Sequence, residues 1–497
     1  MVDITTQNII GGITEFGYNI FYKCEKLKEF ISLKKGFVSD DSMCYIDGNS
    51  LRFFAQGGLN NYIDSNGEIS YVIPDNVVEI NKYAFKETNI ENITIGKSTK
   101  TIGEEAFNKC TYLKSINGWD NVETISQGAF LSCINIEKIS LPTNLKTISN
   151  MAFNSCTKMY LDANIPNSVT EIGREAFAGC VDLKCTEEDL VLKLGNIKKI
   201  KSGAFGGCIS LTKVSINDNI TEIEDSAFQD CINLRSVTIS ENSKLKSIGN
   251  FAFLNCTNLS KLNLPESLTN IGRQSFQNCL SYKGNNDTNV LSIPKSVKTI
   301  GVSCFQETGI ENLNILEGSM LEVISDKAFY GCGNLNKINI SSSENIIRIG
   351  EKAFENCINL TCDDDRLIPV NVKEIYDNAF NGCNSIKKVT LPASEDLKLG
   401  HLCLATGTSN TTINIPIELI MPPIFTMNGQ ESVESYPFGL VEQGNKNKIP
   451  ILSIPSNILL KYIQNIYWRK YLGFNNNFIS GNVQGGKEEG NDELEKL

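Results

Sequence analysis

The stretch Ile223-Glu224-Asp225-Ser226-Ala227-Phe228-Gln229-Asp230-Cys231-Ile232-Asn233-Leu234-Arg235-Ser236-Val237-Thr238-Ile239 decides the fold, because versions of it recur along most of the 497-residue chain. The copies align on one phenylalanine, which stands at Phe21, Phe85, Phe107, Phe130, Phe153, Phe177, Phe205, Phe228, Phe253, Phe276, Phe305, Phe329, Phe354 and Phe380. From Phe85 onwards, neighbouring copies lie between 22 and 29 residues apart. This period, kept over the thirteen copies from Phe85 onwards, predicts a solenoid in which each copy forms one coil.

The apolar residues of the repeat indicate how one coil folds. Leu234, Val237 and Ile239 follow the pattern of a half-buried strand. A second apolar pair, Ile220 and Ile223, precedes the Ala-Phe step, where we expect a short helical or 3₁₀ segment. A single coil cannot bury its own apolar face, so neighbouring coils must stack. The sequence therefore predicts an α/β-type but β-rich leucine-rich-repeat solenoid with parallel β-strands in stacked coils.

The repeat resembles that of the BspA-like leucine-rich-repeat family, whose units carry an Ile-Gly-x2-Ala-Phe-x2-Cys-x2-Leu run. Here the run reads Ile102-Gly103 to Cys110, Ile172-Gly173 to Cys180 and Ile349-Gly350 to Cys357. The resemblance covers roughly residues 13–470. It implies a surface-exposed protein, of the kind found in host-associated bacteria and trichomonad protists, with a role in adhesion or protein–protein binding. It implies no enzyme activity.

Most of the 17 cysteines stand at one position of the repeat. Twelve follow the repeat phenylalanine by three residues: Cys24, Cys110, Cys133, Cys156, Cys180, Cys208, Cys231, Cys256, Cys279, Cys332, Cys357 and Cys383. Thr88 and Thr308 take the place in the other two copies, so the position accepts a small side chain with one donor. We expect a ladder of buried free thiols, with disulfides between coils as the alternative. Without a Cys-x2-Cys pair, and with His401 as the only histidine, we expect neither a metal nor another cofactor.

Breaks in the period divide the chain into segments. We expect a lead-in with a degenerate first repeat (residues 1–30), a β-hairpin insert (31–72), the regular solenoid (73–395), irregular repeats with a C-terminal cap (396–480) and a disordered tail (481–497). Asp47-Gly48 is the tight-turn signal of the hairpin, which is either a recognition element or a lid over the open end. Leu459 to Tyr471 reads as an amphipathic helix, with Trp468 as an apolar plug for the last coil.

The net charge of −11 argues against a nucleic-acid binder. No run of 18 apolar residues predicts a transmembrane segment. Residues 1–10 lack the basic residues and the apolar core of a secretory signal, which favours a cytoplasmic protein. The family resemblance favours the cell surface or secretion instead, and the sequence leaves both open.

Two rows of outward strand positions are the candidate binding surface. They lie two and four residues after the repeat leucine and are polar. The residues we expect to contact a partner are Lys138, Lys213, Lys261, Lys337, Lys388, Ser140, Ser215, Thr238, Asn263 and Asn339. Short hydroxyls and amides offer hydrogen bonds and the lysines offer steering, which suits a polar or acidic partner, either a protein or a glycan. The alternative is that these side chains are only solvated fillers of an exposed strand face.

Two other function classes fit less well. A catalytic solenoid lacks the usual parts, because the chain has one histidine and no Gly-x-Ser-x-Gly, His-Glu-x2-His or phosphate-binding glycine loop. The acidic runs 187–189 and 363–365 are weak calcium candidates. An intracellular structural or self-associating scaffold remains the main alternative, with Cys185 and Cys362 as outward-facing residues that would mediate association.

Overall fold

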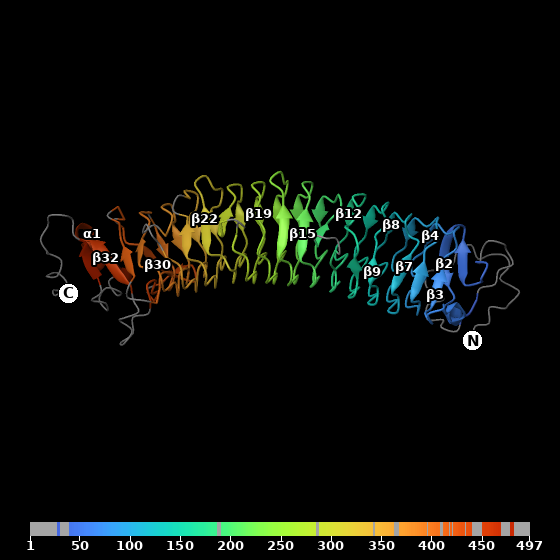
Figure 1. The fold of residues 1–497 in the computed structure, drawn as a ribbon. Helices are drawn as coiled ribbons and strands as arrows, with labels where there is room; N and C mark the ends of the chain where they lie inside the picture. The colour runs from blue at the N-terminus through green and yellow to red at the C-terminus, as the bar shows by residue number, and fades with distance from the viewer. Residues whose placement is uncertain are drawn as a thin grey trace, which may run out of the picture. The chain divides into compact units, whose positions relative to one another are not determined.

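The computed structural model describes residues 27–29, 39–185, 190–284, 288–340, 343–361, 367–394, 396–407, 411–416, 418–419, 421–432, 434–439, 450–468 and 478–481. The first repeat copy, with Phe21 and Cys24, lies outside these residues, and so do both acidic runs and Cys362. The chain forms two compact units, Met1–Thr238 and Ile239–Leu497. Within each unit, successive coils lie side by side and their strands run in parallel ladders (Figure 1).

In the N-terminal unit, each coil contributes one strand to a first ladder and one to a second. The first ladder contains β1 (Cys44–Asp47), β2 (Ser50–Phe54), β4 (Glu79–Ile80), β6 (Thr101–Ile102), β8 (Thr124–Ile125), β10 (Thr147–Ile148), β12 (Glu171–Ile172), β14 (Lys199–Ile200) and β16 (Glu222–Ile223). The second ladder contains β3 (Ser70–Val72), β5 (Asn92–Thr94), β7 (Ser115–Asn117), β9 (Lys138–Ile139), β11 (Tyr160–Leu161), β13 (Val191–Lys193), β15 (Lys213–Ile216) and β17 (Ser236–Ile239). A 3₁₀ helix, η1 (Gln56–Tyr62), lies between β2 and β3.

The C-terminal unit repeats this arrangement. Its first ladder contains β18 (Ser247–Ile248), β19 (Asn270–Ile271), β21 (Thr299–Ile300), β23 (Val323–Ile324), β25 (Arg348–Ile349), β26 (Glu374–Ile375), β28 (Lys398–Leu399), β30 (Ile424–Met427) and β31 (Gln430–Glu431). Its second ladder contains β20 (Val290–Ile293), β22 (Asn312–Ile315), β24 (Lys337–Asn339), β27 (Lys388–Thr390), β29 (Thr412–Asn414), β32 (Ile451–Pro455) and β33 (Phe478–Gly481). An α-helix, α1 (Ser456–Gln464), follows β32. The predicted leucine-rich-repeat solenoid is therefore confirmed.

The repeat phenylalanines form a buried column in each unit. The ring of Phe130 lies 5.2 Å from that of Phe107 and 5.3 Å from that of Phe153, with interplanar angles of 7° and 5°. The same stacking joins Phe305, Phe329 and Phe354 in the C-terminal unit, as far as Phe380. Burying one such side chain is worth about 1.5–3 kcal/mol, so the column is a major part of the core.

The Ala-Phe step is a series of turns, so the expected helical or 3₁₀ segment is wrong. The backbone N–H groups of Phe107 and Lys109 donate to the carbonyls of Ala129 and Leu131 in the next coil. Glu105 and Lys109 have φ values of 49° and 58°, the left-handed conformation that a type II turn needs at its third residue. These N–H groups bond to the next coil. In a helix they would instead point along the helix axis and bond to carbonyls of the same helix.

The cysteine column has the expected thiol geometry. The Cys133 thiol donates to the carbonyl of Phe107 at 2.9 Å, and the Cys156 thiol donates to that of Phe130 at 3.1 Å. Thr308 bonds differently, because its hydroxyl donates to the carbonyl of Phe305 in its own coil at 2.9 Å. All cysteines that the structure describes are free and buried. The hydrogen bonds explain why threonine replaces cysteine in this column.

Both ends of the described array carry an irregular element. The antiparallel pair β1–β2 turns at Gly48, joins the first ladder through β4 and buries Leu51 completely. In the last coils, the buried Trp468 donates its Nε1–H to the carbonyl of Pro423 at 2.9 Å. Among the residues described, no helix is both long and apolar enough to cross a membrane.

Candidate functional site

The second ladder presents rows of outward side chains. In β15, Val214 and Ile216 are buried, Lys213 is exposed and Ser215 is half-buried. The parallel pairing of β13 with β15 places Lys213 beside Val191 and Ser215 beside Lys193. Within each sheet of the ladder, outward positions of neighbouring coils therefore lie side by side, while the ladder itself is divided into several short sheets.

Most candidate residues lie in or next to strands of this ladder, whereas Lys261 and Asn263 lie outside its strands. The five lysines are exposed, as are Ser140, Thr238, Asn263 and Asn339, while Ser215 is half-buried. Lys138 forms an ion pair with Asp162 at 3.3 Å, and the same carboxylate accepts the Ser140 hydroxyl at 2.6 Å. Asp162, which the sequence analysis did not select, thus ties two candidate residues together.

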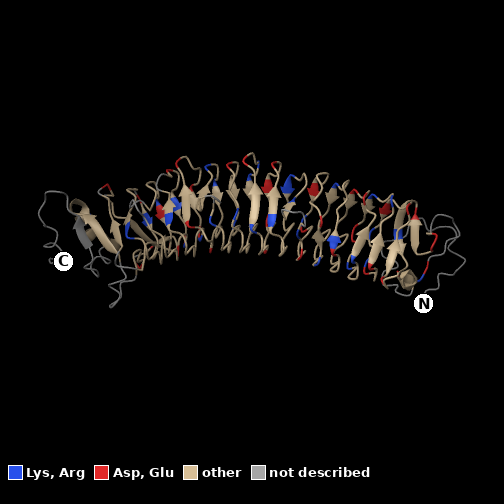
Figure 2. Ribbon diagram, in the orientation of Figure 1, with Lys and Arg blue, Asp and Glu red and all other residues tan. Residues whose placement is uncertain are grey.

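The candidate residues do not form one cluster. Those up to Thr238 belong to the N-terminal unit and the others to the C-terminal unit. Within the C-terminal unit, Lys337 on β24 and Lys388 on β27 are separated by the coil of Thr361, which bridges to Lys337. Basic and acidic residues are also interspersed along the coils of each unit (Figure 2). The lysines are therefore spread along the strand face rather than gathered in a patch.

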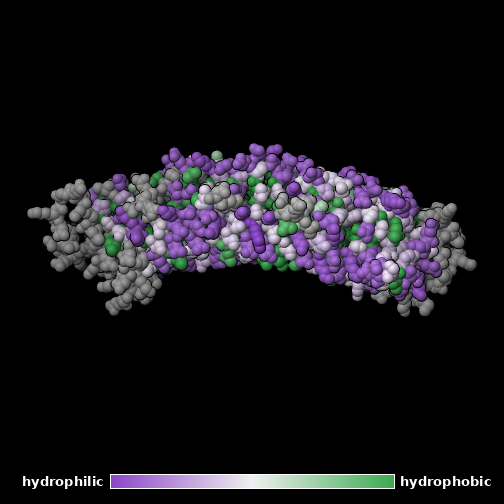
Figure 3. Space-filling model, in the orientation of Figure 1, coloured by the Kyte–Doolittle hydropathy of each residue, from purple (hydrophilic) through white to green (hydrophobic). Residues whose placement is uncertain are grey.

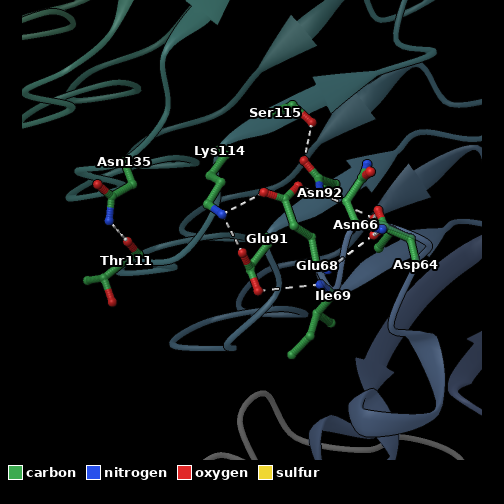
Figure 4. Close-up of polar contacts among 11 residues, drawn as sticks. Asp64, Asn66, Glu68, Ile69, Glu91, Asn92, Thr111, Lys114, Ser115 and Asn135 are labelled. Atoms are coloured by element: carbon green, nitrogen blue, oxygen red, sulfur yellow. Dashed lines mark hydrogen bonds and ion pairs between the residues drawn. The ribbon is translucent and has the colours of Figure 1, made fainter.

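A compact polar network lies at the start of the second ladder (Figure 4). The Lys114 ammonium lies 2.8 Å from Glu68 Oε1 and 2.5 Å from Glu91 Oε2. Glu68 Oε2 accepts a hydrogen bond from Asn92 at 2.8 Å, and Asn92 Oδ1 accepts one from Ser115 at 2.6 Å. The network thus crosses β3, β5 and β7, with its side chains held in place by one another.

The sequence analysis missed the charged members of this network. It considered the second and fourth positions after the repeat leucine, whereas Glu91 and Lys114 stand at the first position of adjacent coils. They could have been found from their opposite charges, because Glu91 and Lys114 stand at the same position of neighbouring copies. Positions in adjacent coils are close enough for such a pair to form an ion pair.

The electrostatics of the network keep its groups charged. The hydrogen bonds from Lys114 and then Asn92 lower the pKa of Glu68. Backbone N–H bonds from Glu68 and Asn66 lower the pKa of Asp64, which also accepts the Ser70 hydroxyl at 2.9 Å. The contacts of Lys114 with Glu68 and Glu91 raise the pKa of its ammonium group. The surface is therefore a fixed pattern of charges at neutral pH.

Apolar side chains accompany this network. Val72, at the end of β3, is 64% exposed, and Ile63, which bridges to Ile69 just before β3, is 55% exposed. The visible face of the N-terminal unit is otherwise mostly hydrophilic, with apolar residues as small separate spots (Figure 3). Exposed apolar atoms beside ordered polar groups are typical of protein recognition surfaces.

Two features of the described residues bear on chemistry. Within the described ranges, no group of three or more His, Cys, Asp or Glu side chains is arranged to hold a metal ion. Cys185, expected on the outer face, is buried, because it bridges to the inward-facing Leu161. The prediction of Cys185 as an exposed association residue is therefore wrong, since it lies in register with Leu161, and both stand five residues after the column cysteine where the buried Ile139 stands six after it.

Comparisons with known proteins agree with this architecture. The family model described as "BspA type Leucine rich repeat region (6 copies)" matches residues 78–189, 184–286, 281–398 and 322–428. A leucine-rich repeat protein from Bacteroides ovatus is 26% identical, with 80% of this chain and 97% of that chain covered and a TM-score of 0.60. A leucine rich cell surface protein from Faecalibacterium prausnitzii is 20% identical, with 79% and 97% covered and a TM-score of 0.39.

A comparison with curated proteins found no match. The family model nevertheless covers well over half of the chain, in the same coils that carry the phenylalanine and cysteine columns. The chain therefore belongs to the BspA-type leucine-rich-repeat family.

Proposed function

We propose that this chain is a non-enzymatic scaffold that binds a protein partner through the outward face of its second ladder. The observation that most supports the proposal is the network around Lys114, in which Glu68, Glu91, Asn92 and Ser115 hold one another across three strands. Side chains that are already ordered lose little conformational entropy when a partner binds, so their contacts contribute more to the affinity.

The rest of the face supplies complementary features. Val72 offers an apolar contact beside the network, and the exposed lysines along the rows attract acidic groups. Adhesion, or recognition of a host protein at a cell surface, is the role that the family resemblance implies for such a scaffold. The partner is then a surface or matrix protein with polar and acidic residues.

The test is capture of host surface and matrix proteins by the purified chain, followed by affinity measurements on the captured protein. The triple variant Lys213→Glu, Lys261→Glu and Lys337→Glu reverses three exposed charges of the second ladder. We expect it to weaken binding about tenfold or more, because it replaces attraction with repulsion.

A matched control reverses three exposed lysines beside the first ladder, with Lys198→Glu, Lys298→Glu and Lys373→Glu. It changes the net charge equally, so we expect little change in affinity. Equal losses in both triple variants would show a nonspecific charge effect and contradict the proposed face. Failure to capture any surface or matrix protein would contradict the adhesive role.

A further inference from the structure

A row of partly apolar side chains follows the cysteine column in the N-terminal unit. We call it the flank stripe; it consists of the residues directly after the cysteines in six consecutive coils: Thr111, Ile134, Thr157, Val181, Ile209 and Ile232. Ile134 and Ile232 are each 39% exposed, and Thr157, Val181 and Ile209 are half-buried. Tyr112, beside the first member, is 55% exposed.

The backbone explains why these side chains face outward. The carbonyl of Thr157 accepts the N–H of Asp182 at 3.0 Å, and the carbonyl of Val181 accepts that of Ser210 at 2.8 Å. The carbonyl of Thr111 accepts a hydrogen bond from the side-chain amide of Asn135 at 2.7 Å. Since the backbone is bonded from coil to coil, the side chains are left on the surface in a straight row, with a step of about 4.8 Å per coil.

The charges next to the flank stripe are few and ordered. The residues that follow the stripe in the six coils are Tyr112, Asn135, Lys158, Asp182, Ser210 and Asn233. Only Lys158 and Asp182 are charged; both are exposed and belong to the two central coils. Within the described residues, neither forms an ion pair. An acidic chain of net charge −11 thus carries one flank with a balanced pair of charges.

The C-terminal unit lacks this feature. Its corresponding row reads Thr257, Leu280, Gly309, Gly333, Ile358 and Asn384. Leu280 and Ile358 are 59% and 49% exposed, but two glycines lie between them and interrupt the apolar surface. The continuous flank stripe is therefore a property of the N-terminal unit and does not follow from the repeat alone.

We propose that the flank stripe binds a second copy of this chain, with a twofold axis between the Phe153 and Phe177 coils. This rotation places Ile134 against Ile209 of the second copy and Thr157 against its Val181. It also places Lys158 against Asp182 of the second copy, and the reverse pair forms by symmetry. The charge order is self-complementary only in this antiparallel arrangement.

The repeat itself favours a second copy as the occupant. Two copies have the same step from coil to coil, so contacts stay in register along all six coils, about 25 Å. Apolar contacts in the row exclude water from the two ion pairs at the centre, where charge complementarity is most effective. The strand face used in the proposed function is left out of this contact.

Sedimentation velocity of the full chain over a range of concentrations tests the proposal. We expect a reversible dimer for the wild type and a monomer for the double variant Ile134→Glu and Ile209→Glu. The matched control, Leu280→Glu with Ile358→Glu in the C-terminal unit, should remain a dimer. A wild-type chain that stays monomeric at every concentration would overturn the proposal.

Exchanging the charges of the exposed Lys158 and Asp182 tests the proposed dimer even if the isoleucine variants fail to fold. Lys158→Asp brings four carboxylates together at the axis, and Asp182→Lys brings four ammonium groups together, so each should weaken dimerisation about tenfold or more. The double variant Lys158→Asp with Asp182→Lys restores both pairs and should dimerise within about threefold of the wild type. A dimer that neither single change weakens, or that the double change does not restore, would contradict the twofold arrangement.

Discussion

The inner coils of the N-terminal unit and the last coils of the C-terminal unit bury aromatic rings in different ways. Phe153 is stacked between Phe130 and Phe177, at 5.3 and 5.5 Å and with interplanar angles of 5° and 11°. Trp468 contacts Phe425 and Tyr462 at 5.1 and 4.8 Å, but with angles of 49° and 77°. Parallel rings present the same face to the next coil, so stacking can continue, whereas a tilted cluster offers no such face.

The largest expected effect comes from breaking the parallel stack. Phe153→Ala leaves a cavity between two phenyl rings and should lower the free energy of unfolding of its unit by about 3–5 kcal/mol. Urea denaturation followed by circular dichroism measures the change. Met421→Ala is the control, because Met421 is 66% exposed and its truncation should cost at most about 0.5 kcal/mol. Equal effects in the two variants would mean that the stack contributes little.

The tilted cluster should respond more locally. Trp468→Ala removes a fully buried ring and its hydrogen bond to Pro423, at a cost of about 3 kcal/mol. Because the cluster lies in the last coils, we expect faster amide hydrogen exchange in α1 and β30 only. Phe153→Ala should instead speed exchange in the coils on both sides of it. Fast exchange throughout the C-terminal unit of the Trp468 variant would contradict this difference.

The cysteine column allows a finer comparison with an isosteric pair. Cys156→Thr replaces the thiol that donates to the carbonyl of Phe130 with a hydroxyl, which, like that of Thr308, can donate to the phenylalanine carbonyl of its own coil. Cys156→Val has the shape of threonine but no donor. The valine variant should therefore be less stable than the threonine variant by about 1–2 kcal/mol, as measured by urea denaturation. Equal stability would show that the column needs only the volume of the side chain.

The pH dependence should separate the inner coils from the last ones. Burial raises the pKa of Cys156 to about 12 and that of Cys332 to about 11. A raised pKa contributes stability below the unfolded value of about 8.5, and this is lost as the pH rises towards the folded value. The stability measured by thermal unfolding should therefore fall as the pH rises from about 8 to about 10.

The pKa of His401 is lowered rather than raised, so its contribution to stability depends on pH in the opposite direction. Its Nδ1 accepts the backbone N–H of Tyr436 at 3.2 Å, and burial lowers its pKa, although Asp377 acts in the other direction. A lowered pKa contributes stability above the unfolded value of about 6.5, and this is lost as the pH falls through the folded value. The protection factor for amide exchange near Tyr436 should therefore fall in acid. The variant His401→Gln should not show that fall. Acid sensitivity that persists in this variant would show that other groups cause it.

The sequence was sufficient for every feature that repeats with the same residue type. The coil spacing, the phenylalanine column and the thiol bonds could be predicted, because each position must satisfy the same neighbours in every coil. The turn conformation could not, since Glu105 and Lys109 are ordinary residues that the bonds between coils hold in the left-handed region. Residue type alone does not reveal such a conformation.

The candidate site was less predictable, because it depends on which side chains meet between coils. The exposure of Lys138 follows from strand alternation, but its ion pair with Asp162 depends on the register of β9 and β11. Similarly, Lys114 meets Glu68 from a coil 46 residues away in sequence. Cys185 shows the opposite error, since its coil and that of Leu161 have one residue fewer between the column cysteine and the inward-facing strand position than the coil of Ile139.

The phenylalanine column also has a consequence for heredity. A deletion of residues 131–153, which is one repeat of 23 residues, joins Phe130 directly to Asn154 and restores an Ala-Phe-x2-Cys run. The stack then contains one ring fewer, and every remaining coil keeps a neighbour of the same kind. Unequal recombination between repeats can thus lengthen or shorten the gene by whole coils, and selection can adjust the length of the strand face without redesigning the core.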